Sequence, residues 1–405
     1  MNYARHKKVS VFENKILMLG ALLALFLSMG QVSASETKNL PSSKAEKVGM
    51  SSDRMARMTA LGERYVENNQ VAGMVNLVMR NGKVIHYQAH GAKGASDDRP
   101  MQKDDLFRIY SMTKPITAAA AMQLYEQGKF QLSDPVAKFV PELKDLKVLN
   151  ADGQLEDQAA PMTMHQLLTH TTGLSYGFAA QTDLVDRAYL GADIWAAKDL
   201  DEFAQRVGQL PLKFQPGSRY HYSIAVDITG LIVQRLSGQS FDVYLQENLF
   251  KPLGMTDTFF EVPEDKMARF LPNHLLDPQT GGLMDVSEVP ADHPLAAFFR
   301  SRKNVAMIDY ESVSLYSGGG GLQSLILRLQ AGLVRLRVEV GVGQVHDVRV
   351  LVVDAVHDVV LLLARRRVHL IQQAGKAHAL RVDSIVVGLR RVPVGGCVGG
   401  MEDDL

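Results

Sequence analysis

The chain has almost no cysteine. Among its 405 residues the only one is Cys397, so the sequence contains neither a disulfide framework nor a cysteine-based metal cluster. It also lacks a net charge, because its 44 basic side chains are balanced by 44 acidic ones. Without an excess of either sign, nothing in the overall charge favours a nucleic acid or an anionic membrane as a partner.

A long apolar run occurs close to the N-terminus, over residues 16–29, and residues 32–34 are small. The basic residues that precede the run are Arg5, Lys7, Lys8 and Lys15. This pattern predicts a signal peptide over residues 1–34 and a mature chain that begins near Ser35, periplasmic or secreted. The alternative is an uncleaved anchor, but the run is short and early for a permanent membrane span. We therefore expect no stable membrane span after cleavage.

Aromatic residues are missing from the last part of the chain. Residues 323–405 contain no Phe, Tyr, Trp, Thr or Asn, and Lys376 is their only lysine. The alternating runs at 336–342 and 345–353 are typical of strands, but a folded domain of this size without one aromatic ring is unusual. The loss of five residue types at one point leads to the hypothesis that residues 323–405 are an aberrant tail, translated out of frame from GC-rich DNA.

The N-terminal part of the mature chain contains regular patterns. Residues 35–52 are polar and predict a linker, and apolar residues recur at helical spacing over 53–68. Two alternating runs, 75–80 and 83–90, are joined by Asn81-Gly82. Because both turn residues tolerate a positive φ, this arrangement predicts a β-hairpin.

Residues 107–117 contain a Ser-x-x-Lys pattern, formed by Ser111 and Lys114, before an Ala-rich apolar run over 118–124. If that run is a helix, Ser111 lies at its first turn and Lys114 lies on the same face. Backbone N–H groups at a helix start stabilise an oxyanion, and a neighbouring amine activates the hydroxyl. Pro115 is compatible with a first helical turn.

Two further segments bear on the site. Residues 167–174 contain His170, and a single histidine in such a loop is more often a structural hydrogen-bonding group than a catalytic base. Residues 317–322 contain four glycines, which indicate backbone packed close to another group, such as a pocket wall. A phosphate-binding loop is disfavoured because no Gly-Lys-Ser/Thr follows.

A serine nucleophile also needs a group that moves protons, and Tyr222 is the candidate. A phenol has an ordinary pKa of about 10, and the Lys114 ammonium would favour the phenolate by lowering that pKa. Considered alone, Tyr222 would be a core aromatic next to a helix.

Together these segments resemble the serine β-lactamase and penicillin-binding protein superfamily, and most closely the class C β-lactamase-like carboxylesterases (family VIII esterases). The matching segments are the Asn81-Gly82 hairpin and residues 107–117, 128–141, 167–174, 216–227, 252–258 and 317–322. The resemblance implies an α/β fold, in which both chain ends contribute to an antiparallel sheet with flanking helices around an inserted all-helical region. The hydrolase domain would cover residues 53–322, which leaves the C-terminal part of its sheet in doubt.

The resemblance also implies roles for individual residues. Ser111 would be acylated, and its backbone N–H would be one donor of the oxyanion hole. Lys114 would share protons with Ser111 and Tyr222, and Tyr222 would be the general base. Tyr176 would line the acyl pocket, although a surface position fits the sequence equally well. No metal or cofactor is implied, and the substrate would be a small-molecule ester or a β-lactam-like compound.

Two departures from the family pattern affect the expected activity. Ile224 stands where β-lactamases of this type carry an asparagine that binds the lactam side chain, so a substrate-binding role for Ile224 favours esters. The family's third motif, which supplies the second oxyanion donor, is missing after Leu322, and losing one such donor lowers the rate by on the order of a hundredfold. We expect a serine carboxylesterase with impaired activity. The alternatives are a β-lactamase or D,D-peptidase with the same residues, and a non-catalytic penicillin-binding-fold protein.

The reading-frame hypothesis is tested by the DNA sequence across the codons for residues 318–325. We expect an insertion or deletion near codons 320–324, and another frame downstream of it that restores aromatic residues. An intact reading frame there would remove the hypothesis.

Overall fold

A computed structural model describes residues 40–277, 281–290, 312–326 and 349–350. The predicted signal peptide lies outside the described residues, as does most of the predicted tail. Within the described ranges, no helix is both long enough and apolar enough to cross a membrane.

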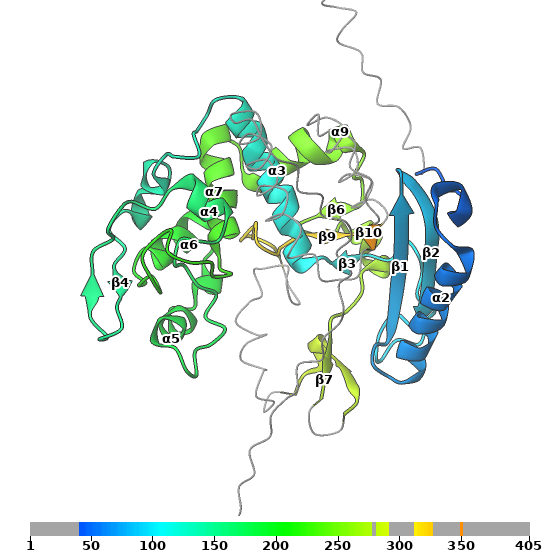
Figure 1. Cartoon of the computed structure of the whole chain (residues 1–405). Coiled ribbons are helices and arrows are strands. Elements are labelled where there is room, and N and C mark those ends of the chain that lie inside the picture. Colours follow the sequence, from blue (N-terminus) through cyan, green and yellow to red (C-terminus); the bar gives the residue numbers. More distant parts are fainter. Residues whose placement is uncertain (1–39, 278–280, 291–311, 327–348, 351–405) are drawn as a thin grey trace, which may run out of the picture. The chain divides into compact units, whose positions relative to one another are not determined.

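The predicted hairpin is confirmed. Strands β1 (Gly73–Arg80) and β2 (Lys83–Gly91) pair antiparallel, and helix α2 (Ser52–Glu67) packs along them (Figure 1). Asn81 and Gly82 have φ values of 51° and 70°, which give the turn its left-handed backbone. The α2 helix begins after Ser51, whose hydroxyl accepts a hydrogen bond from the Arg54 N–H.

Later parts of the chain complete the sheets. Strand β10 (Arg349–Val350) pairs antiparallel with β1, giving the order β10-β1-β2. A second antiparallel sheet has the order β3-β9-β6, formed by β3 (Phe107–Arg108), β9 (Gln323–Ser324) and β6 (Thr258–Phe259). These pairings confirm the predicted α/β class, in which distant parts of the chain share antiparallel sheets.

The segment predicted as a linker is more structured than expected. Within residues 35–52, Ser43 donates its backbone N–H to Val84 of β2, and the Val84 N–H returns a bond to Pro41. A 3-10 turn, Ala45–Val48, then buries both of its terminal side chains. The cause is the open edge of β2, which leaves backbone groups available for pairing.

The remaining regular elements are the helices α3 and α7 and a series of shorter pieces. The helices are α3 (Thr113–Glu126), α4 (Met164–Leu168), α5 (Leu184–Gly191), α6 (Leu200–Val207), α7 (Ala225–Ser237), α8 (Phe241–Leu245) and α9 (Lys251–Leu253), with a π-helical turn at Gln246–Phe250. Further 3-10 turns are Tyr110–Met112, Val136–Lys138, Pro141–Leu143, Ile194–Ala196, Glu264–Arg269 and Val286–Glu288. Two small hairpins consist of β4 (Val148–Leu149) with β5 (Leu155–Glu156), and β7 (His274–Leu276) with β8 (Leu283–Asp285).

The largest hydrophobic core surrounds α3 and α7, which pack against each other (Figure 1). Ile116 and Leu124 of α3 are almost fully buried, as are Ile228 and Leu231 of α7. Each such side chain stabilises the fold by roughly 1.5–3 kcal/mol. The core therefore holds rigidly the two helices that carry or adjoin the candidate site residues.

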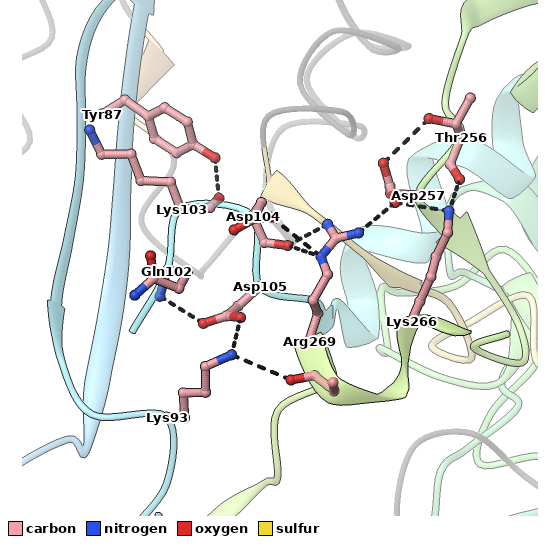
Figure 2. Close-up of polar contacts among 11 residues, drawn as sticks. Tyr87, Lys93, Gln102, Lys103, Asp104, Asp105, Thr256, Asp257, Lys266 and Arg269 are labelled. Carbon is pink, nitrogen blue, oxygen red and sulfur yellow. Dashed lines mark hydrogen bonds and ion pairs between the residues drawn. The ribbon is translucent and has the colours of Figure 1, made fainter. Parts of the chain in front are cut away.

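Polar contacts fix the segment that leads into β3 (Figure 2). Asp257 accepts bonds from Lys266 at 3.0 Å and Arg269 at 3.1 Å, and the Arg269 Nε also donates to the Asp104 carbonyl at 2.8 Å. The Arg269 carbonyl in turn accepts the Leu106 N–H at 2.7 Å. Because Leu106 precedes β3, these contacts set the position of the strand that delivers Ser111.

Replacing Gly82 by alanine tests the hairpin turn. The added Cβ would meet nothing within 4 Å, so the strain comes only from the left-handed backbone. We expect the free energy of unfolding to fall by about 1–2 kcal/mol. Urea denaturation of Gly82→Ala measures this change. The control is Gly191→Ala, which has equally open space but ordinary backbone, and it should be neutral or slightly stabilising. Equal effects of the two substitutions would contradict the turn assignment.

Candidate active site

The backbone around Ser111 is sharply turned. The Ile109 N–H donates to the Leu322 carbonyl at 3.0 Å, and Tyr110 then has φ of 42°. Ser111 lies in the 3-10 turn Tyr110–Met112, two residues before α3, rather than within that helix. A left-handed non-glycine residue is strained and persists only where its surroundings enforce it. Here the strained turn leaves Ser111 partly exposed while Lys114 is buried.

Lys114 is held beside the Ser111 hydroxyl. Its Nζ donates to Ser111 Oγ at 3.2 Å and to the Gly319 carbonyl at 2.5 Å. The side chain lies in the first turn of α3 and is almost fully buried. Burial lowers the pKa of Lys114 to about 8, although the Asp227 carboxylate acts in the opposite direction. The amine is therefore able to lose and regain a proton near neutral pH.

Tyr222 completes the contact with Ser111. Its OH lies 2.5 Å from Ser111 Oγ, and Lys114 Nζ lies 4.6 Å from the centre of its ring. Burial raises the pKa of Tyr222 to about 12, and the bond to Ser111 only partly offsets that rise. The predicted lowering of this pKa by Lys114 is therefore wrong. Lys114, not Tyr222, titrates near neutral pH, because burial disfavours the phenolate by more than the hydrogen bond to Ser111 favours it.

The glycine-rich segment packs against this site, as predicted. A Cβ on Gly319 would lie 2.3 Å from Asp227 Oδ2 and 2.6 Å from the Tyr176 OH, so only glycine fits there. Asp227 Oδ1 accepts bonds from the Gly319 N–H at 2.9 Å and Ser317 Oγ at 2.5 Å. The segment is also fixed to α3, since the Thr117 hydroxyl donates to the Gly318 carbonyl at 2.8 Å.

Tyr176 lies next to the catalytic candidates. Its ring is 5.3 Å from the ring of Tyr222 and 5.3 Å from Lys114 Nζ, and its OH donates to Asp227 Oδ2 at 3.1 Å. On its other sides the ring stacks with Phe178 and Trp195. This arrangement places Tyr176 at the site and not on a remote surface. Its role in lining an acyl pocket stays a prediction.

Polar contacts of Ser175 and Lys213 anchor the loop that carries Tyr176. Ser175 donates to Asp186, and Lys213 forms ion pairs with Asp186 at 2.7 Å and Asp183 at 2.8 Å. Asp186 is almost fully buried, and its charge is stabilised by Ser175, Lys213 and the Ala179 N–H. The ion pairs therefore act as a support for Tyr176 and lie outside the Ser111 contacts.

Ile224 is fully buried in the core around α7 and precedes that helix. It contributes neither a polar atom nor exposed surface, and the substrate-binding role assigned to it stays a prediction. His170 also packs on the site, with its ring 5.0 Å from the ring of Tyr222. Its Nδ1 accepts the Ser223 backbone N–H at 3.3 Å, and burial lowers its pKa to about 4. Both observations agree with the predicted structural role of His170.

The second oxyanion donor expected after Leu322 has no assigned residue. Of that part of the chain, the structure describes only residues 323–326 and 349–350. Gln323 and Ser324 are fully buried in β9, so the change in composition at residue 323 does not coincide with the end of the packed structure. The limits 53–322 and 323–405 stay predictions.

The sequence alone indicated no role for Asp227, Thr113 or Thr117. Thr113 Oγ1 accepts the Leu322 N–H at 3.2 Å, so both threonines connect α3 to the glycine-rich segment. A threonine on a helix gives no sequence signal of such a contact. Asp227 does give one, because it is the only charged residue in the apolar run over 224–233.

The buried amine predicts how the reactivity of Ser111 depends on pH. Only neutral Lys114 can accept a proton, and its fraction increases as the pH rises through its pKa of about 8. We expect the rate of Ser111 modification by a fluorophosphonate to rise with pH and level off above that value. The rate at pH 7 would be about one tenth of the plateau. Ser111→Ala is the control for labelling at other sites. A rate independent of pH between 6 and 10 would contradict the assignment.

Known proteins share this arrangement of segments. The family profile described as Beta-lactamase matches residues 58–338. Protein Rv1367c of Mycobacterium tuberculosis is 34% identical over 296 residues, covering 71% of this chain and 66% of its own length. Esterase EstB of Burkholderia gladioli is 34% identical over 271 residues, covering 66% of each chain. The chain thus spans slightly less than two thirds of the length of these relatives.

Comparison with solved structures finds proteins of similar fold. Unliganded simvastatin synthase (LovD) from Aspergillus terreus superposes with a TM-score of 0.57 at 25% identity, over 71% of this chain and 68% of that one. EstCE1, described as a hydrolase with promiscuous acyltransferase activity, gives a TM-score of 0.53 at 22% identity, over 69% of this chain and 71% of that chain, and supports the fold alone. With the profile matching more than half of its residues, the chain belongs to the beta-lactamase family.

Proposed function

We propose that the protein is a serine hydrolase that cleaves carboxylic esters through an acyl-enzyme. The observation that carries this proposal is the position of Ser111 Oγ, which contacts both Tyr222 OH at 2.5 Å and Lys114 Nζ at 3.2 Å. A hydroxyl with an amine and a phenol in hydrogen-bond reach has both an acceptor for its proton and a route for returning it.

The reaction would proceed in two halves. Ser111 Oγ attacks the ester carbonyl carbon while its proton passes to neutral Lys114, directly or through Tyr222. The C–O bond to the alcohol then breaks, and the alkoxide leaves with a proton returned from Tyr222, which is replenished by Lys114. In the second half, water attacks the acyl carbon, loses a proton to the same pair and releases the acid, so that Ser111 regains its hydrogen.

Two observations favour esters over β-lactams. The relative EstB is named an esterase. At the position where the resemblance places a lactam-binding amide, this chain has the apolar and fully buried Ile224. A β-lactam side chain would therefore lose a hydrogen bond that it makes elsewhere in the family, whereas a simple ester would lose nothing.

We also infer that the protein is exported. The basic residues before the apolar run at 16–29 and the small residues at 32–34 support a cleaved signal peptide. Export would place the site in the periplasm or outside the cell.

Comparing two substrates on the purified chain tests the proposed activity. We expect a short-chain nitrophenyl ester to be hydrolysed and a chromogenic cephalosporin to be cleaved at least fivefold more slowly. The amide contact that is missing at position 224 corresponds to about 1 kcal/mol, which is a factor of about five. Ser111→Ala should abolish both reactions.

The alternatives give different results. Faster cleavage of the cephalosporin would identify a β-lactamase or a D,D-peptidase-like enzyme. Folded protein whose Ser111 is not labelled by a fluorophosphonate would be a non-catalytic member of the family.

A further inference from the structure

Asp227 is a buried carboxylate for which the proposed reaction has no step. It lies in the first turn of α7 and is 1% exposed. A carboxylate in this position is strongly unfavourable unless its charge and its lone pairs have partners. The structure supplies hydrogen-bond partners from two separate segments, the glycine-rich segment 317–322 and the loop that carries Tyr176, and both lie next to the amine of Lys114.

The carboxylate oxygens of Asp227 accept three hydrogen bonds from the described residues. Oδ1 accepts from Ser317 Oγ at 2.5 Å and from the Gly319 N–H at 2.9 Å, and Oδ2 accepts from the Tyr176 OH at 3.1 Å. The backbone N–H of Gly319 can only donate, and a carboxylate can only accept from the two hydroxyls. An anion accepts all three bonds at once, so these bonds and the nearby Lys114 favour the ionised form of Asp227, against the burial that raises the pKa of its carboxyl.

Gly319 is held from both sides by the two charged residues. Its N–H donates to Asp227, and its carbonyl accepts from Lys114 Nζ at 2.5 Å. These two groups belong to the peptide units on either side of the Gly319 Cα, so Asp227 fixes one unit and Lys114 holds the next. A Cβ at residue 319 would collide with both Asp227 and Tyr176, so the close approach requires glycine.

We propose that Asp227 is the positioning residue of this site: it fixes Gly319 so that Lys114 Nζ points at Ser111, and its negative charge stabilises the ammonium form of Lys114. The proposal rests on the proposed acyl-enzyme function, since it assigns a role within that site. Asp227 then has two separable effects. Its charge sets the midpoint of the pH profile, and the length of its side chain sets the position of Gly319.

Few titratable groups lie next to Lys114. Among the described residues they are Asp227 from α7, the rings of Tyr176 and Tyr222, and His170. Burial holds the pKa of both tyrosines above its ordinary value, and burial lowers that of His170 to about 4. These three are therefore neutral between pH 6 and 9. Within the described site, Asp227 is the only one of these groups whose negative charge can stabilise the Lys114 ammonium.

The test is the pH dependence of Ser111 labelling by a fluorophosphonate, measured on the full chain with the variant Asp227→Asn. Asparagine can still accept the bonds from Ser317 and Gly319 but carries no charge. We expect the midpoint of the pH profile to move down by about one unit, since an opposite charge close by shifts a pKa by at least that much. Relative to the plateau, labelling at pH 7 would then increase several-fold.

Two further variants separate the effect of the Asp227 charge from the effect of its hydrogen bonds and side-chain length. Ser317→Ala removes one hydrogen bond and keeps the charge, so its midpoint should match that of the wild-type chain. Asp227→Glu also keeps the charge, but its longer side chain displaces Gly319, so the plateau should fall while the midpoint stays. If Asp227→Asn does not fold, Asp227→Glu still tests the proposal. Its charge is retained, so a downward shift of its midpoint would contradict the role of the charge.

An unchanged midpoint in folded Asp227→Asn, or an equal shift in Ser317→Ala, would overturn the proposal. Labelling does not require ester turnover. Wild-type protein that is labelled but hydrolyses no ester would therefore overturn only the proposed substrate class. Absence of labelling at every pH would overturn both proposals.

Discussion

The burial of one amine is the constraint on which the site depends. Lys114 must lie deep enough for desolvation to bring its pKa to about 8, and a buried ammonium requires acceptors that the surrounding apolar core does not offer. The acceptors come from the main chain of Gly319 and from the hydroxyl of Ser111. Much of the local architecture follows from bringing these groups together, including the close approach of the glycine-rich segment to α3 and α7.

The same constraint explains why rigid packing surrounds the reactive groups. An acyl transfer site needs its hydrogen-bonding groups in place before the substrate arrives, because reorganising them during the reaction would raise the barrier. The core between α3 and α7 holds Lys114 and Asp227, and the ion pairs of Lys213 hold the loop that carries Tyr176. The strained backbone at Tyr110 is tolerated because both sides of the turn are anchored.

Local patterns in the sequence predicted the local structure well. Asn81-Gly82 fixed the hairpin because few residue pairs accept that backbone, and the Ser-x-x-Lys spacing placed Lys114 correctly one turn beyond Ser111. The direction of the Tyr222 pKa was predicted wrongly, since desolvation depends on burial that spacing does not reveal. The contacts of Asp227 could not be predicted either, because they join residues about 90 positions apart. The pairing of residues 41–43 with β2 was missed because backbone groups, not side chains, form it.

The bond between Lys114 and Gly319 joins residues separated by 205 positions, and Ser111 and Tyr222 are separated by 111. Contacts between such distant residues form only after long stretches of chain have been closed into loops. During synthesis, Ser111 and Lys114 are made early, but the carbonyl that orients the amine is added only at residue 319. A nascent chain shorter than this contains the nucleophile without its activating geometry. The reactivity of the serine is therefore acquired late in synthesis, only after residue 319 has been added.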